Sequence, residues 1–115
     1  MKGADINTTS VDGYSCLLWA VTFGCLKTVQ VLVQHGAKVT NANHAGITPL
    51  HRAAKNGNMV IVKYLIAHGA DVAQASDSGR TALHCAAQEG HTNVVTHFLE
   101  HGKGTVTERS PSIYF

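Results

Sequence analysis

The sequence predicts an all-α fold, a solenoid in which short helix pairs stack along one axis, and two observations support this. Three series of glycines recur at a period of about 33 residues, which is typical of stacked helical repeats. They are Gly13, Gly46 and Gly79, then Gly24, Gly57 and Gly90, then Gly36, Gly69 and Gly102. His35, His68 and His101 keep the same register, so one structural unit occurs three times.

The first unit contains the residues expected at the ends of two helices. Ser15 is a typical N-cap residue and predicts a short inner helix over 16–23, which Gly24 ends. An outer helix is predicted over 26–34, because apolar residues recur there and Gly36 follows.

The second unit has the clearest helix signals. Thr48 is a good N-cap, and Pro49 suits the first helical position because its missing N–H is not needed there. Ala53 and Ala54 are small, which allows neighbouring helices to approach closely. Gly57 ends this helix, and an outer helix is predicted over 59–67.

The Thr-Pro-Leu-His sequence at residues 48–51, together with the period of about 33, resembles an ankyrin repeat. The third unit keeps Thr81, Leu83 and His84, whereas the first has Ser-Cys-Leu-Leu at 15–18. The resemblance implies an α-solenoid of stacked ankyrin repeats, with helix–turn–helix pairs joined by β-turn or hairpin loops. We expect a remnant of a preceding repeat tail at 1–9, repeats at 10–42, 43–75 and 76–104, and a mobile tail at 105–115.

The third unit resembles a C-terminal cap. Thr92 occupies the place of Leu26 in the first unit, and His97 that of Val31. We expect both places to face the next repeat of the stack, and a terminal repeat needs a polar outer face.

Composition fits one small intracellular domain. The chain has 115 residues, 44% of them hydrophobic, and a net charge of +2. No apolar run approaches the roughly 20 residues of a membrane span, and the first residues lack the apolar region of a secretory signal. Cys16, Cys25 and Cys85 are expected to be free thiols, because the stack holds Cys16 and Cys85 too far apart for a disulfide. We expect a cytoplasmic or nuclear protein.

No motif indicates catalysis, so we expect no enzyme activity and no cofactor. The histidines in register, such as His35 and His68, should lie about 10 Å apart, too far to share a zinc ion with bonds of about 2.1 Å. The resemblance implies instead that His51 and His84 form hydrogen bonds that hold the inner helices. A metal- or redox-responsive protein stays as an alternative.

The resemblance also implies where a protein partner binds, namely the concave face built from the turn tips and the inner helices. Its residues are Val11, Asp12, Tyr14, Thr22, Phe23, His44, Ala45, Ile47, Lys55, Asn56, Asp77, Ser78, Arg80, Gln88 and Glu89. Among them Tyr14, Phe23 and Ile47 are expected to be apolar anchors. The alternative for the aromatic residues is a surface that another repeat once covered.

The predicted function is therefore a protein–protein interaction module, either an adaptor or an inhibitor that masks its partner. The alternative is a structural spacer, or a truncated isoform of a longer ankyrin array, without a partner of its own. We expect no nucleic-acid partner, because Arg52, Lys55 and Lys63 form no dense stripe. A monomer is expected, with weak self-association as the alternative.

Overall fold

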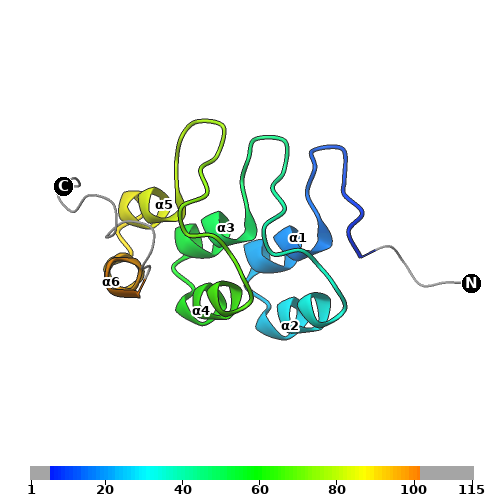
Figure 1. Cartoon of the computed structure of the whole chain (residues 1–115), viewed down its shortest axis with the longest axis horizontal. Coiled ribbons are helices and arrows are strands. Elements are labelled where there is room, and N and C mark those ends of the chain that lie inside the picture. Colours follow the sequence, from blue (N-terminus) through cyan, green and yellow to red (C-terminus); the bar gives the residue numbers. More distant parts are fainter. Residues whose placement is uncertain (1–5, 102–115) are drawn as a thin grey trace, which may run out of the picture.

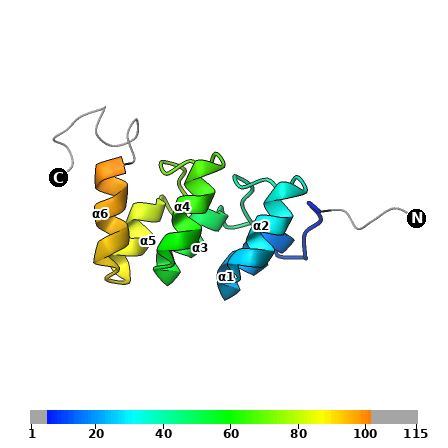
Figure 2. The ribbon, with the colours of Figure 1, turned by 90° about the horizontal axis from the view of Figure 1, so that it is seen from below.

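A computed structural model describes residues 6–101, and the helices in this range form two parallel rows (Figure 1). The inner row holds α1 (Cys16–Phe23), α3 (Pro49–Asn56) and α5 (Ala82–Gln88), and the outer row holds α2 (Leu26–Gln34), α4 (Met59–Ala67) and α6 (Thr92–His101). Figure 2 shows the rows from below, with each outer helix beside the inner helix of its pair. The stack is elongated, 54 × 26 × 23 Å. The predicted all-α repeat solenoid is thus confirmed.

Local capping explains where the helices begin and end. The Ser15 hydroxyl accepts the backbone N–H of Leu18 at 3.1 Å, so α1 starts at the predicted residue. Gly24 ends α1 in the left-handed region, with φ 76°, a conformation that costs glycine little. Thr48 caps α3 in the same way as Ser15 caps α1. The predicted bounds of α1, α2 and α4 are confirmed.

The hydrophobic core lies between the two rows and continues from one repeat to the next. Leu50, Ala53 and Ala54 of α3 are fully buried or nearly so. The small alanine side chains let α3 approach both α1 and α5 closely. Val29 and Leu65 close the core from the outer row.

Neighbouring turn tips are joined by backbone hydrogen bonds. The N–H of His44 donates to the carbonyl of Asp12 at 3.2 Å, and the N–H of Asp77 donates to that of Ala45 at 3.0 Å. These bonds connect the hairpin loops that project from the inner row in Figure 1. The tips therefore form a continuous edge whose spacing is fixed along the stack.

One predicted packing position is only partly covered. Val31 is 51% exposed, so the next repeat does not bury it. The outer helices approach one another less closely than the inner ones, so they leave this side chain uncovered. Tyr64, its equivalent in α4, is partly buried against the core. The cap-like character of the third repeat stays a prediction, and the predicted tail at 105–115 lies outside the described residues.

Candidate partner-binding surface

His51 connects two repeats through hydrogen bonds at both ring nitrogens. Its Nδ1 accepts the backbone N–H of Thr48 at 3.0 Å, and this requires the neutral tautomer that carries its proton on Nε2. The Nε2–H then donates to the carbonyl of Arg80 at 2.8 Å. The side chain is only 2% exposed. The structural role that the ankyrin resemblance implies for His51 is confirmed.

His84 has the same sequence position one repeat later but a different environment. Its Nδ1 accepts the backbone N–H of Thr81 at 3.0 Å. Its Nε2 has no hydrogen-bond partner within residues 6–101, and the side chain is exposed. His84 therefore supports its own helix only, as far as the described chain shows.

Burial lowers the pKa of His51, and the hydrogen bond to the Arg80 carbonyl opposes this shift only in part. The unfolded chain takes up this proton near the ordinary histidine pKa of about 6.5. His51 therefore contributes fully to the free energy of unfolding above about pH 6.5. This contribution decreases as the pH falls below that value.

We expect the free energy of unfolding to fall below pH 6.5 with a slope from His51 of up to about 1.4 kcal/mol per pH unit, the limit for one proton. Urea unfolding between pH 7.5 and 5.0 measures it. The His51→Gln variant should show a shallower slope, because glutamine does not titrate. If the unfolding free energies of the native chain and of His51→Gln fell with the same slope as the pH decreased, the slope could not be assigned to His51.

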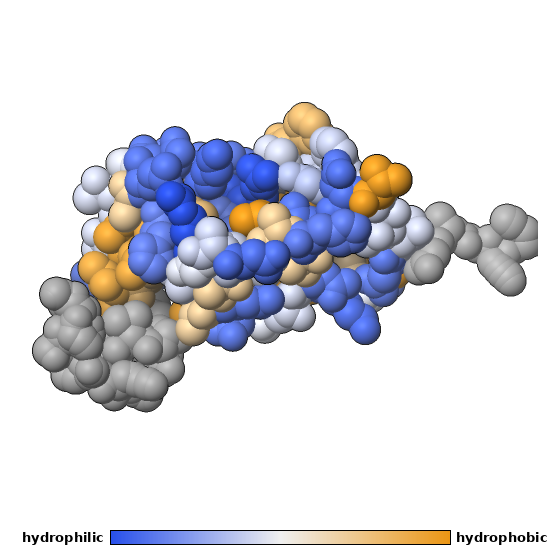
Figure 3. All heavy atoms as spheres, turned by 90° about the horizontal axis from the view of Figure 1, so that it is seen from above, coloured by the Kyte–Doolittle hydropathy of each residue, from blue (hydrophilic) through white to orange (hydrophobic). Residues whose placement is uncertain are grey.

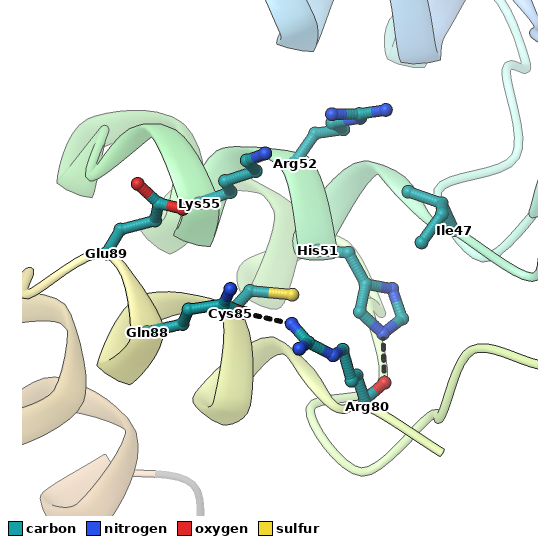
Figure 4. A pocket seen from close by; sticks show the side chains of 8 residues that line it. All are labelled: Ile47, His51, Arg52, Lys55, Arg80, Cys85, Gln88 and Glu89. Atoms are coloured by element: carbon teal, nitrogen blue, oxygen red, sulfur yellow. Dashed lines mark hydrogen bonds between the residues drawn. The ribbon is translucent and has the colours of Figure 1, made fainter. Parts of the chain in front are cut away.

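A cavity of about 230 Å³ lies between α3 and α5 (Figure 4). It is lined by Ile47, His51, Arg52, Lys55, Arg80, Cys85, Gln88 and Glu89. Lys55 comes from α3 and Arg80 from the turn before α5, on opposite sides of the cavity. The structure thus brings together Ile47, Lys55, Arg80, Gln88 and Glu89 of the predicted partner-binding residues. We refer to this cavity as the α3/α5 pocket.

Sequence analysis missed three residues of this pocket, namely His51, Arg52 and Cys85. The available signal was helical spacing, because Arg52 and Lys55 lie one turn apart on α3. Arg52 is half-buried and donates to the Tyr14 hydroxyl at 2.7 Å. Its Nε is buried without a hydrogen-bond partner in the described chain.

The predicted residues of the turn tips and of the α1 end do not line this pocket. Val11 is 88% exposed, and the side chains of Asp12, His44, Ala45, Asp77 and Ser78 are also exposed. Asn56 has a structural contact, since its amide donates to the carbonyl of Thr22 at 3.0 Å. From above the hairpin loops, most of this face is hydrophilic and its hydrophobic side chains form small groups (Figure 3).

Three aromatic rings follow one another along the start of the first repeat. The centroids of Tyr14 and Trp19 are 5.1 Å apart, and those of Trp19 and Phe23 are 5.6 Å apart with nearly parallel planes. Phe23 is 70% exposed, whereas Tyr14 is half-buried. Tyr14 is thus less exposed than Phe23, and its role as an anchor stays a prediction.

Trp19 and Phe23 line a second cavity of about 420 Å³, separate from the α3/α5 pocket. The two helices of the first repeat form it, with Cys16, Trp19, Ala20, Phe23, Cys25, Thr28 and Leu32 as its lining. The equivalent positions in the second repeat, Arg52 and Asn56, contact the preceding repeat through Tyr14 and Thr22. This end groove therefore lies on the side of α1 that faces away from α3.

The cysteines and histidines form no metal site in the part of the chain that is described. No three His, Cys, Asp or Glu side chains among residues 6–101 are grouped closely enough to hold a metal ion. All three cysteines are free, as predicted. Burial raises the pKa of the Cys85 thiol, an effect that the nearby arginines and Lys55 reduce. Within the same range, no helix combines the length and apolar character needed to cross a membrane.

Stacked helix pairs with linked turn tips and a polar pocket on the inner row define a helical-repeat protein. The family model described as ankyrin repeats in three copies matches residues 37–109, more than half of the chain. A model described as a single ankyrin repeat matches residues 12–44. The chain belongs to the ankyrin-repeat family, whose repeats generally act as protein–protein interaction modules and are typically non-catalytic.

Proposed function

We propose that this protein binds a partner protein through its concave face, and that it acts as an adaptor or as an inhibitor that masks the partner. The α3/α5 pocket carries this proposal, because it unites Ile47, Arg80 and Gln88 with further predicted residues around one cavity. Ile47 supplies apolar surface there, and the polar side chains around it can fix the orientation of the bound segment through hydrogen bonds. Partner sites commonly combine these two features.

The stack presents this face with little freedom to move. His51 connects the second repeat to the carbonyl of Arg80, and Asn56 connects it to that of Thr22. A surface that is already ordered loses little conformational entropy on binding. A few anchor side chains are then sufficient for useful affinity.

Affinity capture from a cell lysate tests the location of the site with two variants. The Ile47→Ala, Gln88→Ala variant alters the α3/α5 pocket and leaves its charges unchanged. We expect it to weaken capture of the main partner by about tenfold or more, because anchor residues contribute at least 2 kcal/mol. The comparison requires that all variants unfold at similar urea concentrations.

The Trp19→Ala, Phe23→Ala variant alters the end groove instead, and it should retain the partner. Val60→Ala serves as a control on the outer row, where Val60 is 57% exposed. Loss of the partner with the end-groove variant, and not with the pocket variant, would contradict binding through the concave face. So would an equal loss with the Val60 control.

The second candidate function is a structural segment within a longer stack of repeats. The end groove favours it, since Trp19 and Phe23 occupy positions that contact a preceding repeat in the second unit. In that case the same proteins should be captured by the native chain and by the pocket variant.

A further inference from the structure

The α3/α5 pocket carries an excess of positive charge. Three of its lining residues are cationic, Arg52, Lys55 and Arg80, and one, Glu89, is anionic. His51 adds no charge, because burial lowers its pKa and both of its ring nitrogens already have hydrogen-bond partners. The pocket is therefore electropositive at neutral pH.

Glu89 offsets only part of this charge, and the two arginines donate to neutral groups within the described chain. Arg52 donates to the neutral Tyr14 hydroxyl, and Arg80 donates to the neutral Gln88 side-chain carbonyl. Figure 4 shows the second of these bonds as a dashed line beside Cys85. No ion pair involves Arg52, Lys55 or Arg80 among residues 6–101. These hydrogen bonds hold the arginine side chains in place through neutral partners, and Glu89 is the one carboxylate among the residues that line the pocket.

The size and lining of the pocket limit what it can receive. Its volume of about 230 Å³ is below the roughly 300–1,000 Å³ of small-molecule sites, so one side chain fits better than a cofactor. Arginine presents a planar set of donors that matches a carboxylate. Ile47 at the rim contributes apolar contact for the methylene groups of that side chain.

We propose that the α3/α5 pocket binds the carboxylate of an aspartate or glutamate side chain on an extended segment of the protein partner. The inference rests on the proposed function, because it names the chemistry of the partner at that same site. Arg80 and Lys55 approach the carboxylate from opposite sides. Arg52 contributes positive potential from α3.

A display library of random twelve-residue peptides tests this proposal, with the native chain and two charge variants as targets. The Lys55→Glu, Arg80→Glu variant reverses the charge of the pocket. The matched control is Lys27→Glu, Lys63→Glu, which makes the same change in net charge at exposed positions of α2 and α4. The native chain and the control should both enrich peptides rich in Asp and Glu. Their affinity should fall about tenfold or more on the pocket variant.

Alkylation of the native cysteines then locates the bound peptide. Cys85 lines the α3/α5 pocket, whereas Cys16 and Cys25 line the end groove. An enriched acidic peptide should slow iodoacetamide labelling of Cys85 several-fold and leave the other two rates unchanged. Slower labelling of Cys16 and Cys25 alone would overturn the proposal, because it would place the peptide in the end groove.

The results of these two experiments distinguish the carboxylate proposal from the proposed binding of a protein through the concave face. Enriched peptides without acidic residues that still protect Cys85 would overturn the carboxylate assignment and keep the concave face as the binding site. Binding only after a serine in the peptide is phosphorylated would also overturn it, in favour of a phosphate. Failure to enrich any peptide that protects Cys85 would count against both proposals.

Discussion

The His51→Ala variant is expected to lose about 3–5 kcal/mol of unfolding free energy, whereas His84→Ala should lose about 1 kcal/mol or less. Removal of the His51 ring leaves the N–H of Thr48 and the carbonyl of Arg80 without their partner. Each buried group left in this way costs about 1–3 kcal/mol, and the cavity adds to the loss.

His84 is a matched control, because it makes the same bond to its own N-cap residue, Thr81. It differs in being exposed and in having no bond from Nε2 to a following repeat within residues 6–101. The difference between the two variants therefore measures the connection between the second and third repeats.

Urea unfolding followed by circular dichroism gives both values at pH 7.5. His51→Gln should recover part of the loss, since its amide can still donate to the carbonyl of Arg80. Equal losses for His51→Ala and His84→Ala would show that the contact between repeats contributes little. A three-repeat stack has a stability at the low end of about 5–15 kcal/mol, so the loss is a large part of the total.

The second large effect is expected at Gly46. Gly46→Ala should destabilise the protein by about 1–3 kcal/mol more than Gly79→Ala. Both glycines have positive φ, 80° and 85°, so alanine is strained to a similar extent at either place. A Cβ at Gly46 would lie 2.7 Å from the backbone nitrogen of Asp77, whereas a Cβ at Gly79 meets nothing within 4 Å in the described chain.

The added methyl group must therefore move the third turn tip away from the second. The bond from the N–H of Asp77 to the carbonyl of Ala45 lies at this contact. Hydrogen exchange at the Asp77 amide should be faster in Gly46→Ala and unchanged in Gly79→Ala. Equal unfolding free energies for the two variants, with unchanged exchange at Asp77, would mean that the turn tips accommodate the methyl group without separating.

The sequence predicted the ends of the helices well, because caps act over three or four residues. Ser15 and Gly24 bound α1 through contacts with their immediate neighbours, and this is a local property. The exposure of Val31 was not predicted, for the opposite reason. Its exposure depends on how far apart the outer helices stand, which the residue pattern of one helix does not specify.

In the candidate site, too, the sequence predicted what depends on local position and missed what depends on contacts between repeats. The turn and inner-helix positions of Ile47, Lys55 and Arg80 follow from the repeat register, so the sequence identified them as one face. It missed Arg52, because the bond to Tyr14 joins residues 38 apart in the sequence. Phe23 was assigned to the concave face, and only the packing of α1 on α3 shows that it lines the end groove.

The sequence by itself determined the repeat period, the helix ends and the membership of the ankyrin-repeat family, since each depends on residue types at short, fixed spacings. Only the tertiary structure decided which side chains from α3 and α5 share a pocket and that three cationic residues there lie around one carboxylate. The physical reason is that a pocket depends on the distance and rotation between neighbouring repeats. These are set by the whole interface, from the buried alanines of α3 to the hydrogen bonds of the turn tips.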